Sequence, residues 1–408
     1  MKKISLLAGF LVILLYLFGC NNQSATTDVN IEKLSWPQIE QIGKGKAVTM
    51  VMSVGSKGVN KCMNEFVIPE LLQRFGIKMN IINGQGKEIV SNIMSEKEAG
   101  KAVGQADLCW INGETFYQLR QIDGLFGPYT DKLPNSKFVD YSNPIIKYDF
   151  QEEVKGYETP WSLAAFSLIY DSARVKQAPV SMQDFEQYWK AHPGKFTIPN
   201  DFSGLTLIKT WLIELAGKPD ALDGKFDQHK YDQYSQQLWS WLNKNKQYFW
   251  KKGETFPANN TLVSQMFANG ELDFALSFSV ADIDLKIAEG VYPATSKPLI
   301  LKAGSIQNAN YIGITANSAQ KAAAMVVCNF LISPEAQAKK ADLNFSGAHT
   351  VLSEKKLSSA DQERFNVLAT VKHGLQPKDL EGKAIKEPAP MYMIKVSDDF
   401  RKKVIEAR

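Results

Sequence analysis

Three apolar runs decide the fold of this chain: Ala47-Val-Thr-Met-Val-Met52, Ile77-Lys-Met-Asn-Ile-Ile82 and Asp107-Leu-Cys-Trp-Ile111. Each run is short and rich in apolar residues, which is typical of buried strands. Helix-like sequence follows the first run at Lys61 to Phe75 and the second at Lys87 to Glu98. Strands that alternate with helices in this way predict a parallel, doubly wound sheet.

The loops that follow these strands are the first place to expect a ligand. Parallel sheets bind ligands beyond the carboxyl ends of their strands. Here those ends lead into Ser53 to Asn60, Asn83 to Gly86 and Asn112 to Glu114. The Gly84-Gln85-Gly86 turn lacks the third glycine of a dinucleotide fingerprint, so we do not expect a nucleotide there.

A second α/β region is predicted between Pro179 and Val291. Its expected helices are Ser181 to Lys190 and Thr206 to Ala216, and its expected strands are Lys195 to Ile198 and Phe274 to Val280. Two patterns flank it. Leu163 to Tyr170 reads as a strand before it, and Tyr311 to Thr315 reads as a strand after it. The latter leads into a helix from Ala319 to Leu331, which Ser318 is placed to cap and which is apolar enough to be buried.

The N-terminus has the pattern of a lipoprotein signal peptide. Lys2 and Lys3 precede an apolar stretch from Ile4 to Phe18, which is short for a membrane span. The stretch ends Leu17-Phe-Gly-Cys20, which resembles a lipobox. We expect residues 1–19 to be the signal, Cys20 the lipid-anchored residue, and 20–30 a polar tether. An uncleaved anchor helix, or a periplasmic signal with a coincidental cysteine, remains open.

Composition excludes several classes of protein. The formal net charge of +4 is small for 408 residues and disfavours nucleic acid as a partner. Cys62, Cys109 and Cys328 allow at most one disulfide and show no zinc-ligand spacing, and the apolar surroundings of the last two indicate buried thiols. GxSxG, HExxH and phosphate-loop patterns are absent. We therefore expect no enzyme, no resident metal and no cofactor.

Between Lys46 and about Ser353, the order of several motifs resembles the extracellular solute-binding proteins of ABC importers. The resemblance is greatest to a branch related to thiamine, polyamine and iron binders. The motifs that carry it are Asp107-Leu-Cys-Trp-Ile-Asn-Gly-Glu-Thr-Phe116, Thr159-Pro-Trp161, Lys190-Ala-His-Pro-Gly-Lys-Phe-Thr-Ile-Pro199 with Asp201-Phe-Ser-Gly204, Tyr248-Phe-Trp-Lys-Lys-Gly253 with Phe256-Pro257, and Asn329-Phe-Leu-Ile-Ser-Pro-Glu-Ala-Gln337 with Lys340-Ala-Asp342.

The resemblance implies a two-lobed α/β periplasmic-binding-protein fold of type II, each lobe a mixed sheet flanked by helices. Lobe 1 would comprise 31–162 plus 298–344, and lobe 2 would comprise 163–297 plus 345–408. The ligand would bind between the lobes and favour their closure. The protein would then be a periplasmic, lipid-anchored monomer that delivers its solute to an ABC permease and its ATPase. A surface lipoprotein that binds a protein or host partner, and an envelope hydrolase, remain alternatives.

Family position and side-chain chemistry select candidate ligand-binding residues. Gly55 and Asn60 lie in the first loop, where glycine allows close approach to a ligand, or else form an ordinary turn. Asn112 and Glu114 end the third strand, where Glu114 would pair with a cation or merely offset a helix dipole. Trp161 would stack on a flat or cationic ligand, or pack at the hinge. The remaining candidates are Phe202, Ser203, Ser277, Ser279, Asn308 and Tyr311.

The same residues bear on the solute. Ferric-ion binders of this superfamily use adjacent tyrosines, and no Tyr-Tyr pair occurs in the sequence. An anion such as sulfate or phosphate remains open through Ser53, Ser56 and Ser203. Aromatic and acidic candidates, which include Trp110 and Asp201, favour a small organic cation or heteroaromatic compound, thiamine-like or polyamine-like.

Overall fold

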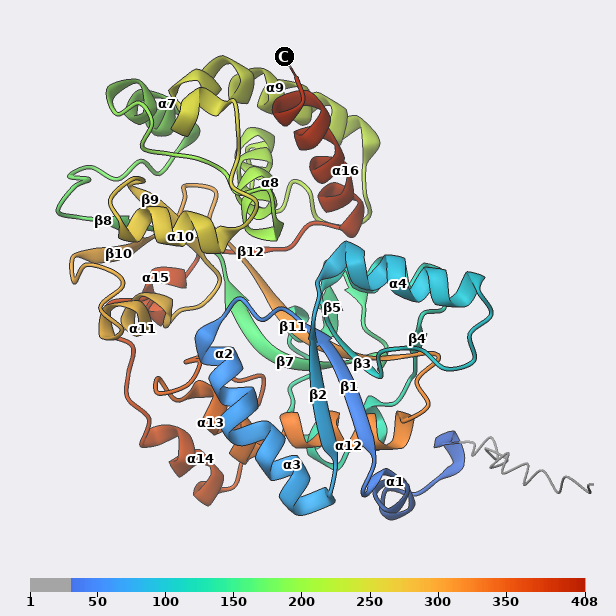
Figure 1. Ribbon diagram of the computed structural model, residues 1–408. Helices are drawn as coiled ribbons and strands as arrows, with labels where there is room; N and C mark the ends of the chain where they lie inside the picture. The colour runs from blue at the N-terminus through green and yellow to red at the C-terminus, as the bar shows by residue number, and fades with distance from the viewer. Residues whose placement is uncertain (1–30, 408) are drawn as a thin grey trace, which may run out of the picture.

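The computed structural model describes residues 31–407 and contains two main sheets with helices packed around them (Figure 1). The predicted signal peptide, Cys20 and tether lie outside these described residues. Within 31–407, no helix combines the length and the apolar character needed to cross a membrane.

The larger sheet has the strand order β12-β11-β3-β1-β2, and β4 and β7 pair with β11. β1 runs parallel to β2 and β3, as the sequence predicts, whereas β11 runs antiparallel to β3, β4 and β7. Its strands are β1 (Ala47–Met52), β2 (Lys78–Asn83), β3 (Leu108–Ile111), β4 (Leu125–Phe126), β7 (Glu158–Ala165), β11 (Ser305–Thr315) and β12 (Ala384–Lys386).

The smaller sheet is antiparallel and has the order β10-β8-β9. Its strands are β8 (Ser167–Asp171), β9 (Phe274–Ser277) and β10 (Ser296–Leu299). β8 follows β7 after one residue, and β10 precedes β11 by a short turn. The chain therefore passes between the two sheets along the paired strands β7 and β11. A separate hairpin joins β5 (Tyr148–Asp149) to β6 (Glu152–Glu153).

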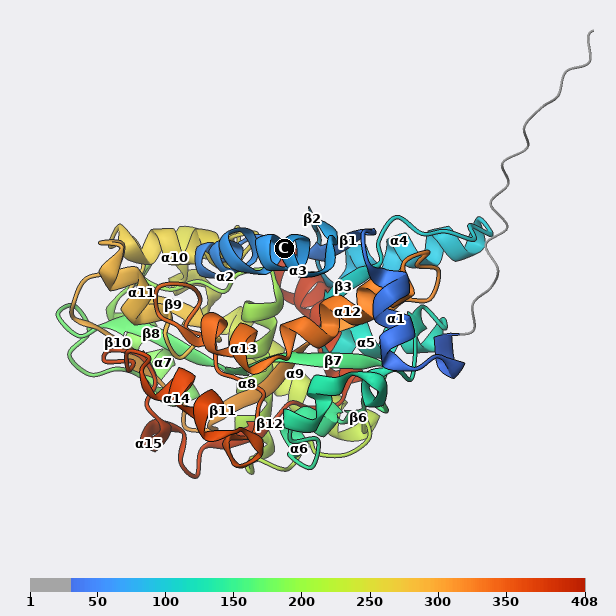
Figure 2. The same ribbon diagram turned by 90° about the horizontal axis from the view of Figure 1, so that it is seen from below.

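Helices cover both sheets, and α2 and α10 lie along one edge of the molecule while α14 and α15 lie along the opposite edge (Figure 2). The α-helices are α1 (Trp36–Gly43), α2 (Lys57–Cys62), α3 (Ile68–Phe75), α4 (Gly86–Glu98), α5 (Gly113–Gln121), α6 (Pro144–Lys147), α7 (Met182–Ala191), α8 (Phe202–Ala216), α9 (Gln228–Asn245), α10 (Asn260–Ala268), α11 (Asp282–Ala288), α12 (Lys321–Leu331), α13 (Pro334–Ala341), α14 (Ser359–Asn366), α15 (Pro377–Leu380) and α16 (Pro390–Phe400). Two π-helical turns, Met63–Val67 and Arg401–Ile405, extend α2 into α3 and continue α16.

The larger sheet has a hydrophobic core on each face. Successive strand residues point to opposite faces, so Leu108 packs with α1, α3 and α12, whereas Cys109 and Ile111 pack with α4 and α5. α12 is buried along most of its length, as its apolar sequence predicts. Cys62, Cys109 and Cys328 are buried free thiols, which confirms that interpretation for the last two.

The core of the smaller sheet is rich in aromatic rings. Trp189 lies within 6.0 Å, centroid to centroid, of Trp211 and of Trp241. Trp239 is also buried, and the Trp250 indole donates a hydrogen bond to Glu271. The tryptophans of the 239–250 stretch therefore have packing and anchoring roles.

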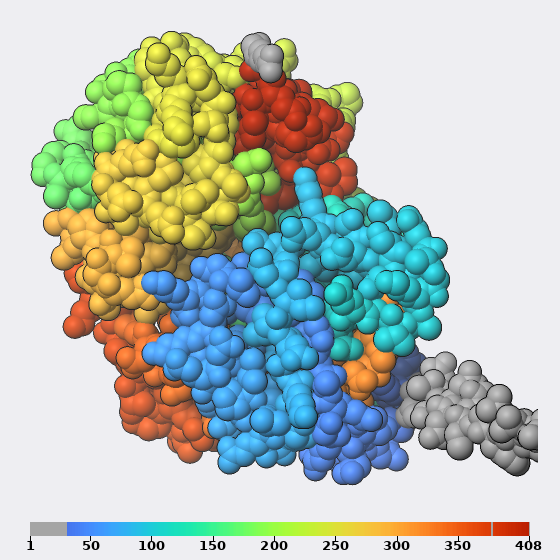
Figure 3. Space-filling model, viewed as in Figure 1, coloured from blue at the N-terminus to red at the C-terminus, as the bar shows by residue number. Residues whose placement is uncertain are grey.

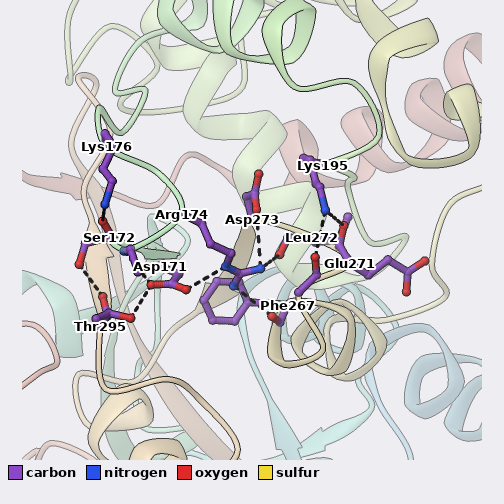
Figure 4. Close-up of polar contacts among 12 residues, drawn as sticks. Asp171, Ser172, Arg174, Lys176, Lys195, Phe267, Glu271, Leu272, Asp273 and Thr295 are labelled. Carbon is purple, nitrogen blue, oxygen red and sulfur yellow. Dashed lines mark hydrogen bonds and ion pairs between the residues drawn. The ribbon is translucent and has the colours of Figure 1, made fainter.

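Arg174 fastens the edge of the smaller sheet to the helices around it (Figure 4). Its guanidinium donates to Asp171 at 2.8 Å and to the carbonyls of Leu272 and Phe267, and it lies 3.6 Å from Asp273. Because a guanidinium offers five donors in a fixed plane, one side chain satisfies acceptors from two separate chain segments.

Several local predictions differ from the structure; for example, the strand expected over Leu163 to Tyr170 is divided between β7 and β8. Lys195 to Ile198 is irregular, because its backbone pairs with single loop residues (Phe196 O accepts from Trp250 N), and its apolar pattern reflects burial alone. β9 ends at Ser277, before the predicted Val280. α12 begins after Gln320, so Ser318 is not its N-cap, although the Ser318 hydroxyl accepts from the Gln320 amide.

Candidate functional site

Elements packed on the larger sheet meet those of the smaller sheet at several points. A Cβ on Gly55 would lie 3.6 Å from the hydroxyl of Thr261 at the start of α10. Lys57 lies 3.6 Å from Glu289, and Lys87 donates to Ser397 of α16 at 3.0 Å. Figure 3 shows the side on which the α2 region meets the segments of α10 and α11. The structure is therefore closed at this junction.

A buried ion pair joins Lys209 of α8 to Glu387, just after β12. Asn308 of β11 donates to the second oxygen of Glu387 at 3.0 Å. The Lys209 ammonium also lies 4.5 Å from the centroid of the Phe150 ring and 5.7 Å from that of Phe202. We call Glu114, Asp149, Phe150, Phe202, Lys209, Asn308 and Glu387 the junction cluster.

Helix α8 places two members of this cluster. Asp201 caps its N-terminus by accepting from the amides of Ser203 and Gly204. A Cβ on Gly204 would lie 1.8 Å from the Pro199 carbonyl, so only glycine allows this close start. Phe202 and Lys209 are seven residues apart and therefore share one helix face.

Glu114 reaches the junction from the first turn of α5. Its Oε2 is buried and has no hydrogen-bond partner. Loss of solvation raises the pKa of Glu114 from its ordinary value to about 7, and the nearby charge of Lys209 opposes the rise. Glu114 is therefore a carboxyl group that changes charge near neutral pH.

Asp149 and Glu158 extend this acidic region into the larger sheet. Asp149 is 1% exposed and Glu158 is fully buried. No side chain bonds any of their four carboxylate oxygens, and the Gly113 amide beside Asp149 is the one backbone donor near them. Burial raises the pKa of both groups well above the ordinary range; the charge of Glu114 adds to the effect on Asp149, and the charge of Asp149 to that on Glu158. A buried carboxylate without a partner is costly, so these oxygens call for a proton or an external cation.

The β5–β6 hairpin carries Asp149 and Phe150 into the junction. Phe150 and Gln151 both have positive φ, at 46° and 65°, which non-glycine residues adopt at a cost. Gln151 donates to the Glu387 carbonyl at 3.1 Å and accepts from the Gly224 amide, which holds this turn. The Phe150 ring lies against Gly113, where a Cβ would come within 1.8 Å of it.

Helix N-termini around the junction are satisfied by the chain itself. Ser56 accepts from Val59 in α2, Asp201 caps α8, and Asn259 caps α10. The Gln85 amide at the start of α4 donates to Glu88, and Asp149 lies beside the Gly113 amide at the start of α5. A free helix N-terminus is the usual anion site, and these are occupied by oxygens of the protein.

The structure brings three sequence-predicted residues together in the junction cluster: Glu114, Phe202 and Asn308. Ser277 and Ser279 lie beside them, because they flank Phe278, whose ring centroid is 5.2 Å from that of Phe202. The two serines bond to each other, with the Ser279 amide donating to the Ser277 hydroxyl at 3.1 Å. Ser203 lies in the first turn of α8 and is mostly buried.

The other predicted residues are not members of the cluster, although Asn112 and Tyr311 adjoin it: Asn112 precedes Gly113 and Glu114, and the charge of Asp149 contributes to raising the pKa of Tyr311. Gly55 is exposed in the β1–α2 loop, and the Asn60 side chain donates to the Val54 carbonyl, which stabilises that loop. Asn112 is the N-cap residue of α5 but makes no side-chain cap. Trp161 is 4% exposed and meets Trp110 edge to face at 4.9 Å. Tyr311 is fully buried and donates to the carbonyls of Ile145 and Ile146.

For Trp161 and Tyr311, this geometry favours packing over ligand contact. The Trp161 carbonyl accepts from Gln337 and Lys340 of α13, so its backbone and its ring are both engaged within the protein. In this structure the Trp161 side chain packs inside the protein, and contact between Trp161 and a ligand stays a prediction.

Sequence reasoning missed Asp149, Phe150, Lys209 and Glu387. Lys209 left the clearest signal, since it is a single lysine in the apolar helical stretch from Leu205 to Leu215. A buried lysine requires a partner. That partner is 178 residues away in sequence, and nothing in the pattern names it.

A family model for bacterial extracellular solute-binding proteins matches residues 67–366. The chain belongs to this family. Protein YnjB from Escherichia coli K12 is 32% identical over 359 residues, which cover 87% of this chain and 90% of that protein.

Solved structures of similar fold include periplasmic binding proteins for different solutes. AfuA from Actinobacillus pleuropneumoniae, with exogenous fructose-6-phosphate bound, has 13% identity and a TM-score of 0.62, covering 88% of this chain and 98% of AfuA. Iron-bound HitA from Pseudomonas aeruginosa has 15% identity and a TM-score of 0.59, covering 86% and 98%. A putative spermidine/putrescine ABC transporter protein from Listeria monocytogenes has 13% identity and a TM-score of 0.60, covering 88% and 98%.

The predicted two-lobed periplasmic-binding-protein fold is therefore confirmed. By family, the chain is a bacterial extracellular solute-binding protein. At these identities the solved structures establish the fold alone, and the solute must be argued from the junction itself.

Proposed function

We propose that this protein captures a small organic cation between its lobes and delivers it to an ABC permease and its ATPase. The observation that carries the choice of a cation is the set of buried carboxylate oxygens without side-chain partners on Glu114 and Asp149. A positively charged solute would supply the missing donors and the missing charge. A heteroaromatic cation, thiamine-like, or an amine, polyamine-like, has this character.

The state of the helix N-termini supports a cation over an anion. Ser53, Ser56 and Ser203 kept sulfate or phosphate open in the sequence. Ser56 and Asp201 now occupy the amides of α2 and α8. An anion would also approach Glu114 and Glu387, which oppose it electrostatically.

In this proposal the junction cluster lies between the two lobes. The segment 346–366 belongs with 31–162 and not with 163–297, because Val351, Leu352 and Leu357 share a core with Ile39 and Leu71. The protein acts as a monomer, carries no cofactor and catalyses no reaction. Cys20 anchors it by lipid on a tether of residues 20–30, which would hold the binding lobes near the permease.

Thermal shift against a panel of cationic, neutral and anionic metabolites tests the proposal. A solute at 100 times its dissociation constant adds about 2.7 kcal/mol of stability, and we expect cations alone to do so. A surface protein for a macromolecular partner would respond to none of the panel. An envelope hydrolase would consume its ligand, which mass spectrometry of the mixture would detect.

A further inference from the structure

Two carboxyl groups in the junction are short of donors: Glu114 Oε2 has no hydrogen-bond partner, and Asp149 has none beyond the backbone amide of Gly113 beside it. The two groups come from neighbouring segments, since the Phe150 ring next to Asp149 lies against Gly113, which precedes Glu114. Asp149 is 1% exposed, so bulk solvent does not reach it in this structure. The unmet requirement is for N–H or O–H donors, and not for charge alone.

The aromatic faces of the junction are already engaged by a cation. The Lys209 ammonium lies over the rings of Phe150 and Phe202, and Glu387 neutralises it. A permethylated ammonium binds best to free aromatic faces and has no N–H to donate. The junction therefore offers a permethylated ammonium no free aromatic surface. Such a group would also leave the carboxylate oxygens of Glu114 and Asp149 without donors.

We propose that Glu114 and Asp149 form a subsite for an N–H-bearing cationic group, such as a primary ammonium, an amidinium or a guanidinium, and that it rejects quaternary ammonium. This inference rests on the proposed function and narrows its substrate class. Each ligand N–H would donate to one of the unmet oxygens, and charge-assisted hydrogen bonds of this kind are the strong ones. Phe150, held against Gly113, would limit the width of the group that enters.

Matched probe pairs test the subsite by isothermal titration calorimetry. The probes are ethanolamine against choline, 1,4-diaminobutane against its hexamethylated form, and agmatine. We expect at least one N–H probe to bind, at least tenfold more tightly than any quaternary probe. Equal or tighter binding of a quaternary probe, or no binding by any N–H probe, would overturn the inference.

Variants place the binding in the junction. Asp149→Asn and Glu114→Gln keep side-chain size, and each should weaken the N–H probe at least tenfold. Glu153→Gln is the matched control, because Glu153 lies on the same hairpin, is exposed, and pairs only with Lys147 at 3.4 Å. It should bind as the wild type does, and melting curves confirm that each variant is folded. Wild-type affinity in both junction variants would contradict the subsite.

The two proposals fail in different ways. If a quaternary cation of the panel stabilises the protein and no N–H cation does, capture of a cation stands and this subsite is wrong. If no solute of any class stabilises the protein, both the proposed function and the subsite are wrong.

Discussion

Replacing Glu114 by glutamine removes the one junction carboxyl group whose pKa lies near neutrality. Burial raises that pKa from 4.5 to about 7, and a shift of this size corresponds to about 3 kcal/mol. The ionised group therefore costs the empty folded protein up to about 3 kcal/mol relative to the unfolded chain. Glutamine has nearly the same shape and never ionises.

The sign of the effect depends on pH. Between pH 4.5 and 7 the unfolded chain releases the Glu114 proton while the folded protein keeps it. Since the folded state binds more protons there, its stability falls as pH rises, and the loss is complete above about pH 7. The stability difference between Glu114→Gln and the wild type should thus grow by about 3 kcal/mol, in favour of the variant, from pH 4.5 to pH 8.

Urea unfolding of the empty proteins at pH 4.5, 6 and 8 measures this difference. Glu153→Gln serves as the control, and its difference from the wild type should stay within about 1 kcal/mol because its ion pair is exposed. A difference for Glu114→Gln that stays constant over the three pH values would refute the reasoning.

Three further predictions concern stability and access. Lys209→Met should lower the free energy of unfolding in urea by about 3–5 kcal/mol, because it leaves Glu387 buried and unpaired. Adding Glu387→Gln to this variant should recover part of the lost stability. An unchanged free energy of unfolding in Lys209→Met would argue against the ion pair. Trp161→Ala should lower the free energy of unfolding by about 3–5 kcal/mol, because the ring is buried. An unchanged melting temperature would instead favour the role of Trp161 in stacking on a ligand. Iodoacetamide at pH 8 should leave Cys62, Cys109 and Cys328 unlabelled in the native protein and should label them in urea. Burial raises the pKa of Cys62 and of Cys328 to about 11, which disfavours the reactive thiolate. Rapid labelling of the native protein, detected by peptide mass spectrometry, would contradict the burial of these thiols.

The fold was largely predictable where local pattern and burial coincide. The apolar runs before and after α2 and α3 became β1 and β2 within a residue at each end. β11 shows where this fails. It was expected from Tyr311 but begins at Ser305, because Asn308 and Asn310 interrupt its apolar pattern with side chains that bond Glu387 and Ser162.

The site was less predictable, because its contacts join distant segments. Glu114 and Phe202 follow from their places at helix starts near strand ends. Asp149 and Phe150 lie in a loop-rich stretch with no periodicity, and only the folded hairpin brings them to Gly113. Lys209 stands out in the sequence because it is a lysine within an apolar helical stretch. Its partner Glu387 lies in the C-terminal segment, which the family motifs do not cover.

Hydrogen–deuterium exchange with and without the solute that stabilises the protein most tests the junction directly as the binding site. We predict protection in four separated segments: 112–116, 148–151, 202–209 and 384–387. Two surface hollows offer a contrasting outcome, one of about 470 Å³ beside Asn83 and Lys87 and one of about 560 Å³ beside Trp239 and Lys403. Protection confined to either hollow, with the four junction segments unchanged, would contradict the account.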